Sequence, residues 1–192
     1  MIQRILALVL FIFCLPLLAV LYIIVKLDSR GPFVFKQLRA GKNKKPFTMF
    51  KIRTMVGNAE QLRSKIQHLN EVERPAFKIR NDPRYTRAGK WISHLALDEI
   101  MQFVNVIKGE MALVGPRPLP VREANKVPDK YSSRFTVLPG ITSSWIIKGA
   151  HKLGFQKWME LDCTYVKEKS DFLDTKIFVK TVLNLIKGMA RI

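Results

Sequence analysis

A long apolar run near the start of the chain constrains the fold more than any other feature. Residues 5–25 form 21 positions without a charge, between Arg4 and Lys26. As a helix this run is about 31 Å long at roughly 1.5 Å per residue, which matches a hydrocarbon core of about 30 Å. It lacks the short apolar region and small-residue cleavage site of a secretory signal peptide. The sequence therefore predicts a membrane helix that is retained in the protein.

Pro16 lies near the middle of this run. Because proline removes one backbone hydrogen bond and clashes with the preceding turn, it tends to kink a helix. Two geometries fit: a helix that spans the bilayer, and a re-entrant helix that breaks at Pro16 and returns to the side it entered from. Composition alone favours the span, which is the commoner structure. The excess of Lys and Arg after residue 25 places the C-terminal flank in the cytoplasm.

The chain is strongly basic, with 33 Lys+Arg against 15 Asp+Glu and a net charge of +18. Residues 26–90 hold 17 of the basic and 5 of the acidic residues, so most of the excess follows the membrane run directly. Because 48% of the residues are hydrophobic, the charge belongs to a folded protein and not to a disordered tail. Such a surface favours anionic lipids, phosphorylated substrates or nucleic acid. Nucleic acid is the weakest of these hypotheses, since no helix-turn-helix, OB-fold or RRM motif accompanies the charge.

The rest of the pattern indicates an α+β fold that is mainly helical with a small β-hairpin. Four elements are predicted in the first part: strands at 33–35 and 47–52, and helices at 58–70 and 97–108. Asn58 is the expected cap of the first helix, and Gly109 is expected to stop the second. A further strand is expected at 111–114. We expect a single catalytic domain after the membrane helix, so that the chain divides into 1–26 and 27–192.

Residues 173–192 predict a basic amphipathic helix at the C-terminus. At about 100° per residue four cations fall within an arc of roughly 60°: Lys176, Lys180, Lys187 and Arg191. The apolar residues on the other side are Phe178, Val182, Leu185, Ile186, Met189 and Ile192. Such a helix either packs its apolar face on the core or lies in the headgroup region of a membrane. Both alternatives stay open, and interfacial amphipathic helices are part of the expected fold.

Asp98 and Glu99 begin the helix predicted at 97–108, whose apolar residues fall on nearly every face, so that it is expected to be buried almost all round. Acidic residues are common in a first turn because the helix dipole favours them, and for an isolated pair this is the better interpretation. Burial of the pair favours a functional interpretation instead, since a partly desolvated carboxylate pair is costly without a metal or a cationic partner. Neighbouring side chains point about 100° apart on a helix. One carboxylate is therefore able to attack a substrate while the other binds a metal or orients its neighbour.

Arg117 stands out among the cations because Pro116 and Pro118 fix its backbone on both sides. A guanidinium held in this way offers a fork that matches phosphate oxygens. Phosphoryl transfer from a nucleotide diphosphate needs such a fork, a divalent cation and an in-line nucleophile. Together with the two carboxylates, Arg117 supplies each of these roles except the metal.

Six sequence blocks occur in the order that is typical of one family. They cover residues 27–37, 50–55, 81–86, 97–111, 114–118 and 138–142. In these blocks the chain resembles the bacterial sugar transferases, the monotopic polyprenyl-phosphate phosphoglycosyl transferases, in their minimal catalytic form. Six ordered blocks are far more specific than any single motif. The resemblance extends over essentially the whole chain.

The resemblance implies a membrane enzyme with a re-entrant helix broken at Pro16, which reverses the preference for a span. Its catalytic domain would lie on the cytoplasmic face of the bacterial inner membrane, against anionic lipids. The implied reaction moves a sugar-1-phosphate from a UDP-sugar to undecaprenyl phosphate, releases UMP, and is the first membrane step of a surface glycan or exopolysaccharide. No nucleic acid partner is expected, and self-association into a homodimer is compatible with the sequence.

The same resemblance assigns roles to individual residues. Asp98 would be the nucleophile that takes the phosphosugar covalently, with Glu99 as its partner in a dyad. Mg²⁺ would bind at these two carboxylates and at the diphosphate. Arg117 would contact the phosphates of the nucleotide-sugar. Further substrate-binding positions in the matching blocks are Lys51, Arg53, Arg84, Pro116, Pro118 and Thr142.

The chain departs from the family pattern at several positions. Leu15 precedes Pro16 where Ser is common, and Ser93 and Met101 stand where Arg and Pro are usual. After Thr142, Ile146 and Ala150 replace a glutamine and an arginine. These differences support an alternative, a weakened relative that binds lipid or nucleotide-sugar without efficient turnover. The sequence does not identify the sugar or the glycan.

Overall fold

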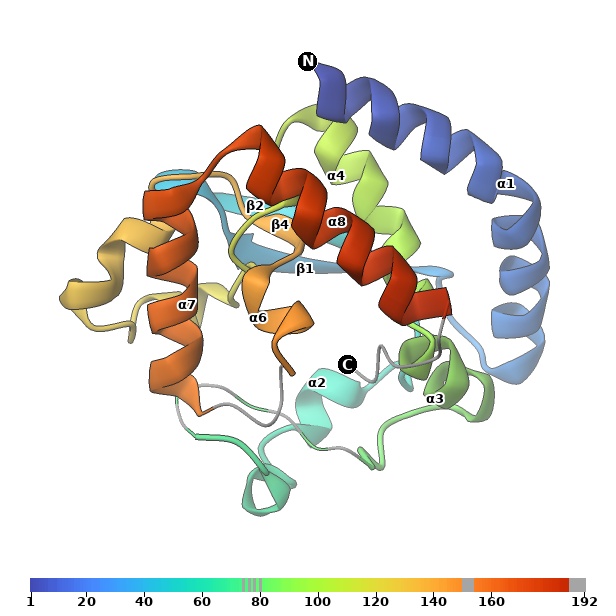
Figure 1. Cartoon of the computed structure of the whole chain (residues 1–192). Coiled ribbons are helices and arrows are strands. Elements are labelled where there is room, and N and C mark those ends of the chain that lie inside the picture. Colours follow the sequence, from blue (N-terminus) through green and yellow to red (C-terminus); the bar gives the residue numbers. More distant parts are fainter. Residues whose placement is uncertain (74, 76, 78, 80, 150–153, 187–192) are drawn as a thin grey trace.

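The computed structural model describes residues 1–192 apart from 74, 76, 78, 80, 150–153 and 187–192. The fold mixes α and β structure and is mostly helical (Figure 1). The helices are α1 (Ile2–Asp28), α2 (Ala59–Leu62), α3 (Arg87–His94), α4 (Gln102–Lys108), α5 (Val121–Ala124), α6 (Ser144–Ile147), α7 (Phe155–Glu168) and α8 (Asp171–Ile186). The strands are β1 (Val34–Ala40), β2 (Pro46–Ile52), β3 (Ala112–Val114) and β4 (Gly140–Thr142). Short 3₁₀ segments cover Lys42–Lys44, Gln67–Leu69, Leu97–Met101 and Asp129–Phe135.

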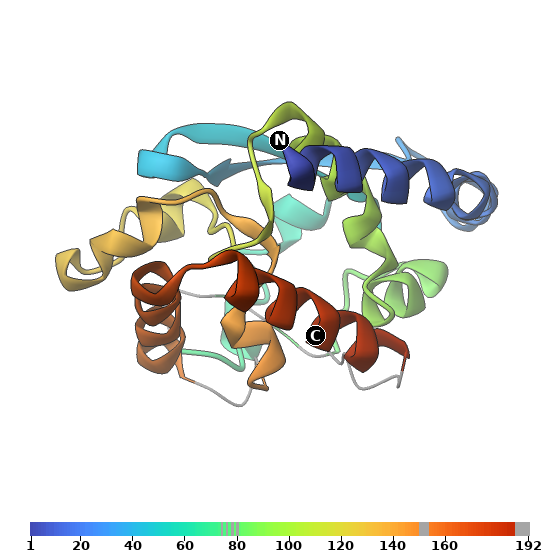
Figure 2. The same cartoon turned by 45° about the horizontal axis from the view of Figure 1, so that its top comes forward.

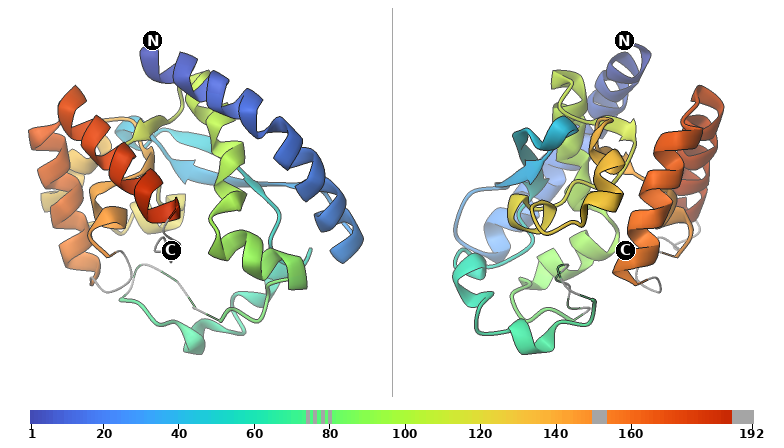
Figure 3. Two further views of the ribbon diagram at one scale, coloured as in Figure 1. Left: turned by 45° about the vertical axis from the view of Figure 1, so that its right-hand side comes forward. Right: turned by 90° about the vertical axis from the view of Figure 1, so that its left-hand side faces the viewer.

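β1 and β2 form the predicted antiparallel hairpin, with Val34 opposite Ile52 and Ala40 opposite Pro46. β1 is longer than the prediction. In the turn Asn43 and Lys44 both have a left-handed backbone, with φ of 55° and 59°. Figures 1 and 3 show α1 and α4 on one side of this hairpin and α7 on the other. α1 also meets α8 directly, since the Gln3 side chain donates to Asp174 Oδ2 at 3.4 Å.

The predicted strand at 111–114 is confirmed as β3, which pairs in parallel with β4. β3 continues into the loop that carries Arg117, and at the start of this loop two glycines, Gly115 and Gly140 of β4, allow the two backbones to approach closely. A Cβ on Gly140 would lie 2.0 Å from the Gly115 nitrogen, and one on Gly115 would lie 2.5 Å from the Leu138 oxygen. No side chain fits at that separation. The glycine pair thus fixes where the Pro-Arg-Pro loop leaves the sheet.

α1 runs without interruption through Pro16, but its direction changes about halfway along (Figures 1 and 2). It is long and apolar enough to cross a membrane. Ala7, Leu18, Leu21 and Val25 are buried against the rest of the protein, and α1 packs against α4 and α3. Most of its other apolar side chains are exposed, as expected for a surface that meets lipid.

Both ends of α1 are hydrogen-bonded to the domain that follows. Near the start, the Leu113 backbone N–H donates to Gln3 Oε1 at 3.1 Å. At the end, the Arg53 guanidinium donates to the carbonyl oxygens of Val25 and Ser29. The helix is therefore attached at both termini and does not project away from the domain.

Two helix predictions were wrong in detail. The segment 58–70 holds only α2 and the 3₁₀ segment Gln67–Leu69, and Asn58 makes no side-chain cap. Leu62 and Ile66 are only half-buried, so little packing is available to stabilise a longer helix. The segment 97–108 begins as a 3₁₀ turn and becomes α4 at Gln102, and Gly109 ends it as predicted.

The segment 97–108 was also expected to bury its apolar residues on nearly every face, and this is wrong. Its buried residues are mostly polar: Asp98, Glu99, Gln102 and Asn105, together with Val106. The Asn105 side chain accepts from the Phe50 N–H and donates to the Thr48 oxygen, so it binds the backbone of β2. The inward face of this segment is therefore held by polar contacts with the hairpin as well as by the packing of Val106 in the core.

The C-terminal helix begins at Asp171, and its described part only partly matches the prediction. Lys176 and Lys180 are exposed as expected, and Ile177 is buried. Val182 and Leu185, expected on the opposite face, are 37% and 42% exposed. The predicted positions from 187 onward lie outside the described residues. α8 thus packs on the core and also presents apolar side chains to its surroundings.

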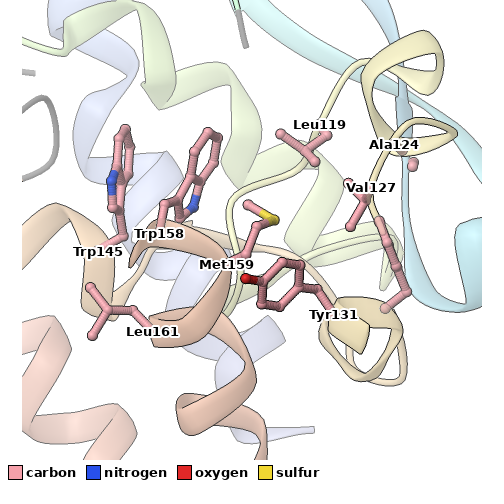
Figure 4. Close-up of a cluster of buried hydrophobic side chains, with 10 residues drawn as sticks. Leu119, Ala124, Val127, Tyr131, Trp145, Trp158, Met159 and Leu161 are labelled. Atoms are coloured by element: carbon pink, nitrogen blue, oxygen red, sulfur yellow. The ribbon is translucent and has the colours of Figure 1, made fainter. Parts of the chain in front are cut away.

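A large buried cluster joins α5, α6 and α7 (Figure 4). At one end of it lie Trp145 and Trp158, whose rings stack with centroids 4.4 Å apart. Leu119 and Met159 are almost fully buried beside them. This cluster fixes the start of α7 against the loop after Arg117.

Candidate active site

A cavity of about 720 Å³ opens between the hairpin, the turn Leu97–Met101 and the loop after β3. Its volume is within the range of small-molecule sites. The residues that line it include Lys51, Asp98, Glu99, Arg117 and Pro118. These five residues come from three separate sequence blocks, which therefore meet in one space.

The two carboxylates lie on the 3₁₀ turn Leu97–Met101. Their side chains are only 7% and 10% exposed, for Asp98 and Glu99 respectively. The turn follows Ala96, whose φ of 55° is left-handed and uncommon for a residue other than glycine. A conformation of this kind costs on the order of 1 kcal/mol and is often found near functional sites. The backbone turns sharply at Ala96, immediately before the two carboxylates.

Lys51 of β2 is the central cation of this cluster. Its Nζ lies 2.8 Å from Asp98 Oδ2 and 3.0 Å from Glu99 Oε1. The Lys51 side chain is 17% exposed, so both ion pairs are largely desolvated. Arg117 adds a second cation to Glu99, with Nη2 3.3 Å from the same Oε1. Glu99 thus has two cationic partners and Asp98 has one in the described part of the chain.

These contacts separate the titration of the two carboxyls. Burial raises the pKa of Asp98, and the charge of Glu99 adds to this effect while Lys51 opposes it. Burial acts in the same direction on Glu99, but Lys51 and Arg117 outweigh it and lower its pKa to about 2. Burial would lower the pKa of Lys51, yet the two carboxylates raise it. At neutral pH Glu99 is therefore ionised and Lys51 is protonated.

The backbone of Arg117 is supported from behind by Arg134, which sequence analysis missed. Arg134 Nη2 donates to the Arg117 carbonyl at 2.9 Å. Arg134 is also paired with Asp162 of α7 at 2.8 Å, and both side chains are almost completely buried. This buried pair connects α7 to the loop that aims Arg117 into the cavity.

Two other predicted substrate-binding residues, Arg53 and Arg84, line the cavity, but their guanidinium groups bind other parts of the protein. The five N–H groups of Arg53 face the end of α1, where they bind Val25, Ser29, Arg30 and Pro32. Arg84 forms a bidentate pair with Asp82, at 2.9 and 2.6 Å. These contacts favour an anchoring role for both arginines.

Two further predicted positions support the site from outside the cavity lining. The hydroxyl of Thr142 is buried and lies 2.6 Å from that of Thr181. Pro116 is buried, and its carbonyl accepts from the Gly140 N–H. Three of the predicted substrate-binding residues line the cavity beside the dyad and do not bind other parts of the protein as Arg53 and Arg84 do. They are Lys51, Arg117 and Pro118.

Several cavity residues were not predicted, among them Arg39, Arg63 and Glu123. A signal for Arg39 was present in the sequence. In the hairpin Phe35 pairs with Lys51 and Arg39 with Phe47, so Arg39 and Lys51 lie on the same face. Extending the first strand to residue 40 would have placed Arg39 beside the site. Arg63 and Glu123 lie on short segments whose positions depend on tertiary packing.

In the described residues no group of three or more His, Cys, Asp or Glu side chains forms a metal cluster. Asp98 and Glu99 are adjacent carboxylates, and a single cationic group, Lys51 Nζ, contacts both of them. Mg²⁺ is commonly held by one or two carboxylates together with substrate phosphates. The donor set therefore fits a metal whose remaining ligands come from a substrate.

Comparison with known proteins points to one family. The sequence model of the bacterial sugar transferases matches residues 1–188. The chain is 38% identical over 159 residues to the galactosyl transferase CpsE of Streptococcus agalactiae, which covers 82% of this chain and 35% of that protein. It is 33% identical over 170 residues to the undecaprenyl-phosphate galactose phosphotransferase of Salmonella typhimurium, covering 86% of this chain and 36% of that protein.

A third relative is closer to this chain in length. The uncharacterized sugar transferase EpsL of Bacillus subtilis is 35% identical over 178 residues, which covers 92% of this chain and 82% of EpsL. The chain spans only about a third of the length of the other two relatives. The family match extends over the membrane helix, the dyad and the Pro-Arg-Pro loop alike. The chain belongs to the bacterial sugar transferase family.

Proposed function

We propose that this protein transfers a sugar-1-phosphate from a UDP-sugar to undecaprenyl phosphate and releases UMP. The observation that carries the proposal is the buried dyad, Asp98 and Glu99, in a cavity whose cations include Lys51 and Arg117. A cationic cavity suits a diphosphate, and a carboxylate in it suits covalent phosphoryl transfer. The relative from Salmonella carries the name of an undecaprenyl-phosphate galactose phosphotransferase.

In the proposed first step a carboxylate oxygen of Asp98 attacks the phosphorus that carries the sugar. The bond between this phosphorus and the bridging oxygen breaks, and UMP leaves with that oxygen. In the second step a phosphate oxygen of undecaprenyl phosphate attacks the same phosphorus, and the Asp98 carboxylate is released. Two in-line steps replace one direct transfer between two bulky anions.

The contacts favour Asp98 over Glu99 as the nucleophile. Glu99 is bound by both Lys51 and Arg117, and its pKa of about 2 marks it as a weak base. Among the described residues Asp98 is paired only with Lys51, through Oδ2. Burial raises its pKa, which makes its ionised form the better nucleophile of the two. Glu99 would instead hold Lys51 and Arg117 in place.

Asp98 and Glu99 are the residues that would hold Mg²⁺, the divalent cation expected from the family. When bound, the ion would spread the charge that develops on the diphosphate. Lys51 contacts the same two carboxylates and keeps a positive charge beside them. Arg117 would orient the phosphates through its planar fork.

We further propose that α1 enters and leaves the membrane on the same side. A spanning helix would separate its two ends by the thickness of the bilayer, about 30 Å. Here Gln3 binds Leu113 and the other end binds Arg53, two residues of one domain. Together with the basic flank, this supports a catalytic domain on the cytoplasmic face of the inner membrane.

A second candidate function is binding without efficient turnover. Ser93 lines the cavity where the family pattern has an arginine, and its hydroxyl lies 3.1 Å from that of Tyr85. Ile146, in place of a glutamine, packs against the tryptophan cluster. The first change replaces a cation at the cavity by a hydroxyl, and the second removes an amide group, which favours weaker catalysis.

The test measures UMP release by the purified membrane protein from a panel of UDP-sugars with undecaprenyl phosphate and Mg²⁺. We expect UMP from at least one sugar, and no UMP above background from Asp98→Asn. Asp171→Asn, at the exposed start of α8, is the matched control and should equal the parent. UMP release by Asp98→Asn at the parent rate would refute the nucleophile. Nucleotide-sugar binding without UMP from any donor would favour the second candidate.

Topology has a separate experiment. A cysteine placed before Ile2 is treated in intact cells with a membrane-impermeant thiol reagent. We expect labelling only after the cells are opened. Labelling from outside would show that α1 spans the bilayer.

A further inference from the structure

Arg39 and Glu123 face the same cavity and are not part of the mechanism described above. Arg39 lies on β1 and Glu123 on α5, and these two elements pack together. Neither residue was predicted from the sequence. Their arrangement suggests a second point of substrate recognition beside the dyad.

Arg39 carries a positive charge that lacks a close counter-ion. Its Nη1 donates to the Pro118 carbonyl at 2.9 Å and its Nη2 to Gln37 Oε1 at 2.6 Å, both neutral acceptors. Its buried Nε has no partner among the described residues, and no carboxylate there lies within ion-pair distance of the guanidinium. Burial lowers the pKa of Arg39 to about 10, and the charge of Arg117 adds to that effect.

Glu123 is a buried carboxylate with one cationic partner among the described residues, Arg63. Its side chain is 9% exposed, and Oε1 accepts from Arg63 Nη2 at 3.0 Å. Burial nevertheless raises the pKa of Glu123 to about 7, although the charge of Arg39 opposes the rise. A carboxylate in this position is stabilised by further hydrogen-bond donors.

The two groups interact through their charges yet do not form an ion pair. Since both face the cavity, a ligand that offers an acceptor to Arg39 and a donor to Glu123 satisfies both. Arg39 also lies close enough to Arg117 for the two like charges to disfavour each other, so an anion between them is stabilised twice. A phosphate ester of a polyol offers this combination, a phosphate with a hydroxyl a few bonds away.

We propose that Arg39 and Glu123 bind the phosphate and an adjoining hydroxyl group of the nucleotide-sugar, and so take part in choosing the substrate. This inference rests on the proposed function, because it assigns residues to the donor of that reaction. The hydroxyl belongs either to the ribose or to the transferred sugar, and both present the same chemistry. A site built to hydrogen-bond a hydroxyl discriminates strongly against an analogue that lacks it.

The experiment measures equilibrium binding of four probes by calorimetry. UMP is compared with 2′-deoxyuridine 5′-monophosphate for the ribose, and glucose 1-phosphate with 2-deoxyglucose 1-phosphate for the sugar. Arg39→Gln should weaken the binding of UMP and glucose 1-phosphate about tenfold or more, the usual effect of one charge-assisted hydrogen bond. Lys42→Gln, in the exposed turn of the same hairpin, loses the same charge and should leave binding unchanged.

Glu123→Gln should keep or increase affinity for phosphate, since a negative charge is removed. It should also reduce, by about tenfold, the preference of the parent for the hydroxyl-bearing member of one probe pair. The pair that changes identifies the ribose or the sugar as the source. Glu160→Gln, on α7 and paired only with neighbours on its own helix, is the control for loss of an acidic charge.

Arg63→Gln distinguishes recognition from a structural role of Glu123. It breaks the same ion pair, so a structural role predicts that it alters the hydroxyl preference as Glu123→Gln does. We expect it to leave that preference unchanged. Matching effects of the two variants would overturn the proposal, as would a parent protein that prefers neither hydroxyl-bearing probe or an Arg39→Gln variant that binds like Lys42→Gln.

UMP release is measured on the same samples, so the two proposals fail separately. A parent protein that releases UMP but shows unchanged probe preferences in Glu123→Gln refutes the recognition role alone. A parent that binds the probes as expected without releasing UMP refutes the transfer reaction and leaves the recognition role in place.

Discussion

Replacing Lys51 by methionine tests the electrostatic balance of the site. The change keeps an unbranched side chain but removes the cation 2.8 Å from Asp98 and 3.0 Å from Glu99. Glu99 retains Arg117 at 3.3 Å, whereas Asp98 loses its cationic partner. Breaking one partner of a buried ion pair costs about 3–5 kcal/mol, and we expect the lower end because Asp98 is able to take up a proton.

About 3 kcal/mol corresponds to a fall in melting temperature of roughly 6–12 °C for a domain of this size. Lys45→Met, in the exposed turn of the same hairpin, should change it little. The decisive measurement is a rescue. In an Asp98→Asn, Glu99→Gln background Lys51 has no carboxylate to compensate, so Lys51→Met should cost about 1 kcal/mol or less. An equal loss of stability in both backgrounds would refute the argument.

The pH dependence of UMP release provides a second measurement on the same variant. Lys51 favours the ionised form of Asp98, so its removal raises the pKa of Asp98 further. Residual activity of Lys51→Met should therefore fall off at a higher pH than that of the parent on the acidic side. An unchanged acidic limb would show that Lys51 does not set the charge of Asp98.

Two further outcomes follow from the same structure. Since the pKa of Glu99 is lowered to about 2, its ionised form stabilises the fold above its ordinary pKa of about 4.3, and this contribution is lost as the pH falls toward 2. Urea unfolding between pH 5 and about 2 should thus show a steeper loss of stability for the parent than for Glu99→Gln; parallel curves would contradict the assignment. Gly140→Ala should destabilise the protein by at least about 3 kcal/mol, because its Cβ would lie 2.0 Å from the Gly115 nitrogen. Gly57→Ala, with nothing within 4 Å of the added carbon, is the control in thermal unfolding, and equal melting temperatures of the two variants would exclude a tight backbone contact.

Local sequence signals predicted the parts of the fold that depend on local structure. The apolar run, the hairpin and the glycine at the end of α4 were all visible as patterns over a few residues. The dyad and Arg117 were also identified, since two acids beside an apolar segment and a Pro-Arg-Pro turn are unusual on chemical grounds.

The remaining features depend on contacts between distant segments. Lys51 meets the dyad only because β2 packs against the turn Leu97–Met101. Arg53 has the same charge and lies in the same block, yet it binds the end of α1. The polar face of α4 was missed because Asn105 pairs with the β2 backbone, 55 positions away in sequence. The hydrophobic periodicity of one segment contains no information about which distant segment its polar residues will contact.

The short spacing between Lys51 and Arg53 bears on how far Asp98 lies from the lipid. Lys51 near the end of β2 and Arg53 just after that strand are two positions apart, and they contact Asp98 and the C-terminal end of α1 respectively. At about 3.3 Å per residue the spacing between these anchors is roughly 7 Å along the strand. In the proposed arrangement with α1 in the membrane, the end of β2 would set the height of Asp98 above the lipid headgroups. An acceptor phosphate carried on a lipid would then meet the carboxylate near the surface, with its hydrocarbon chain still in the bilayer.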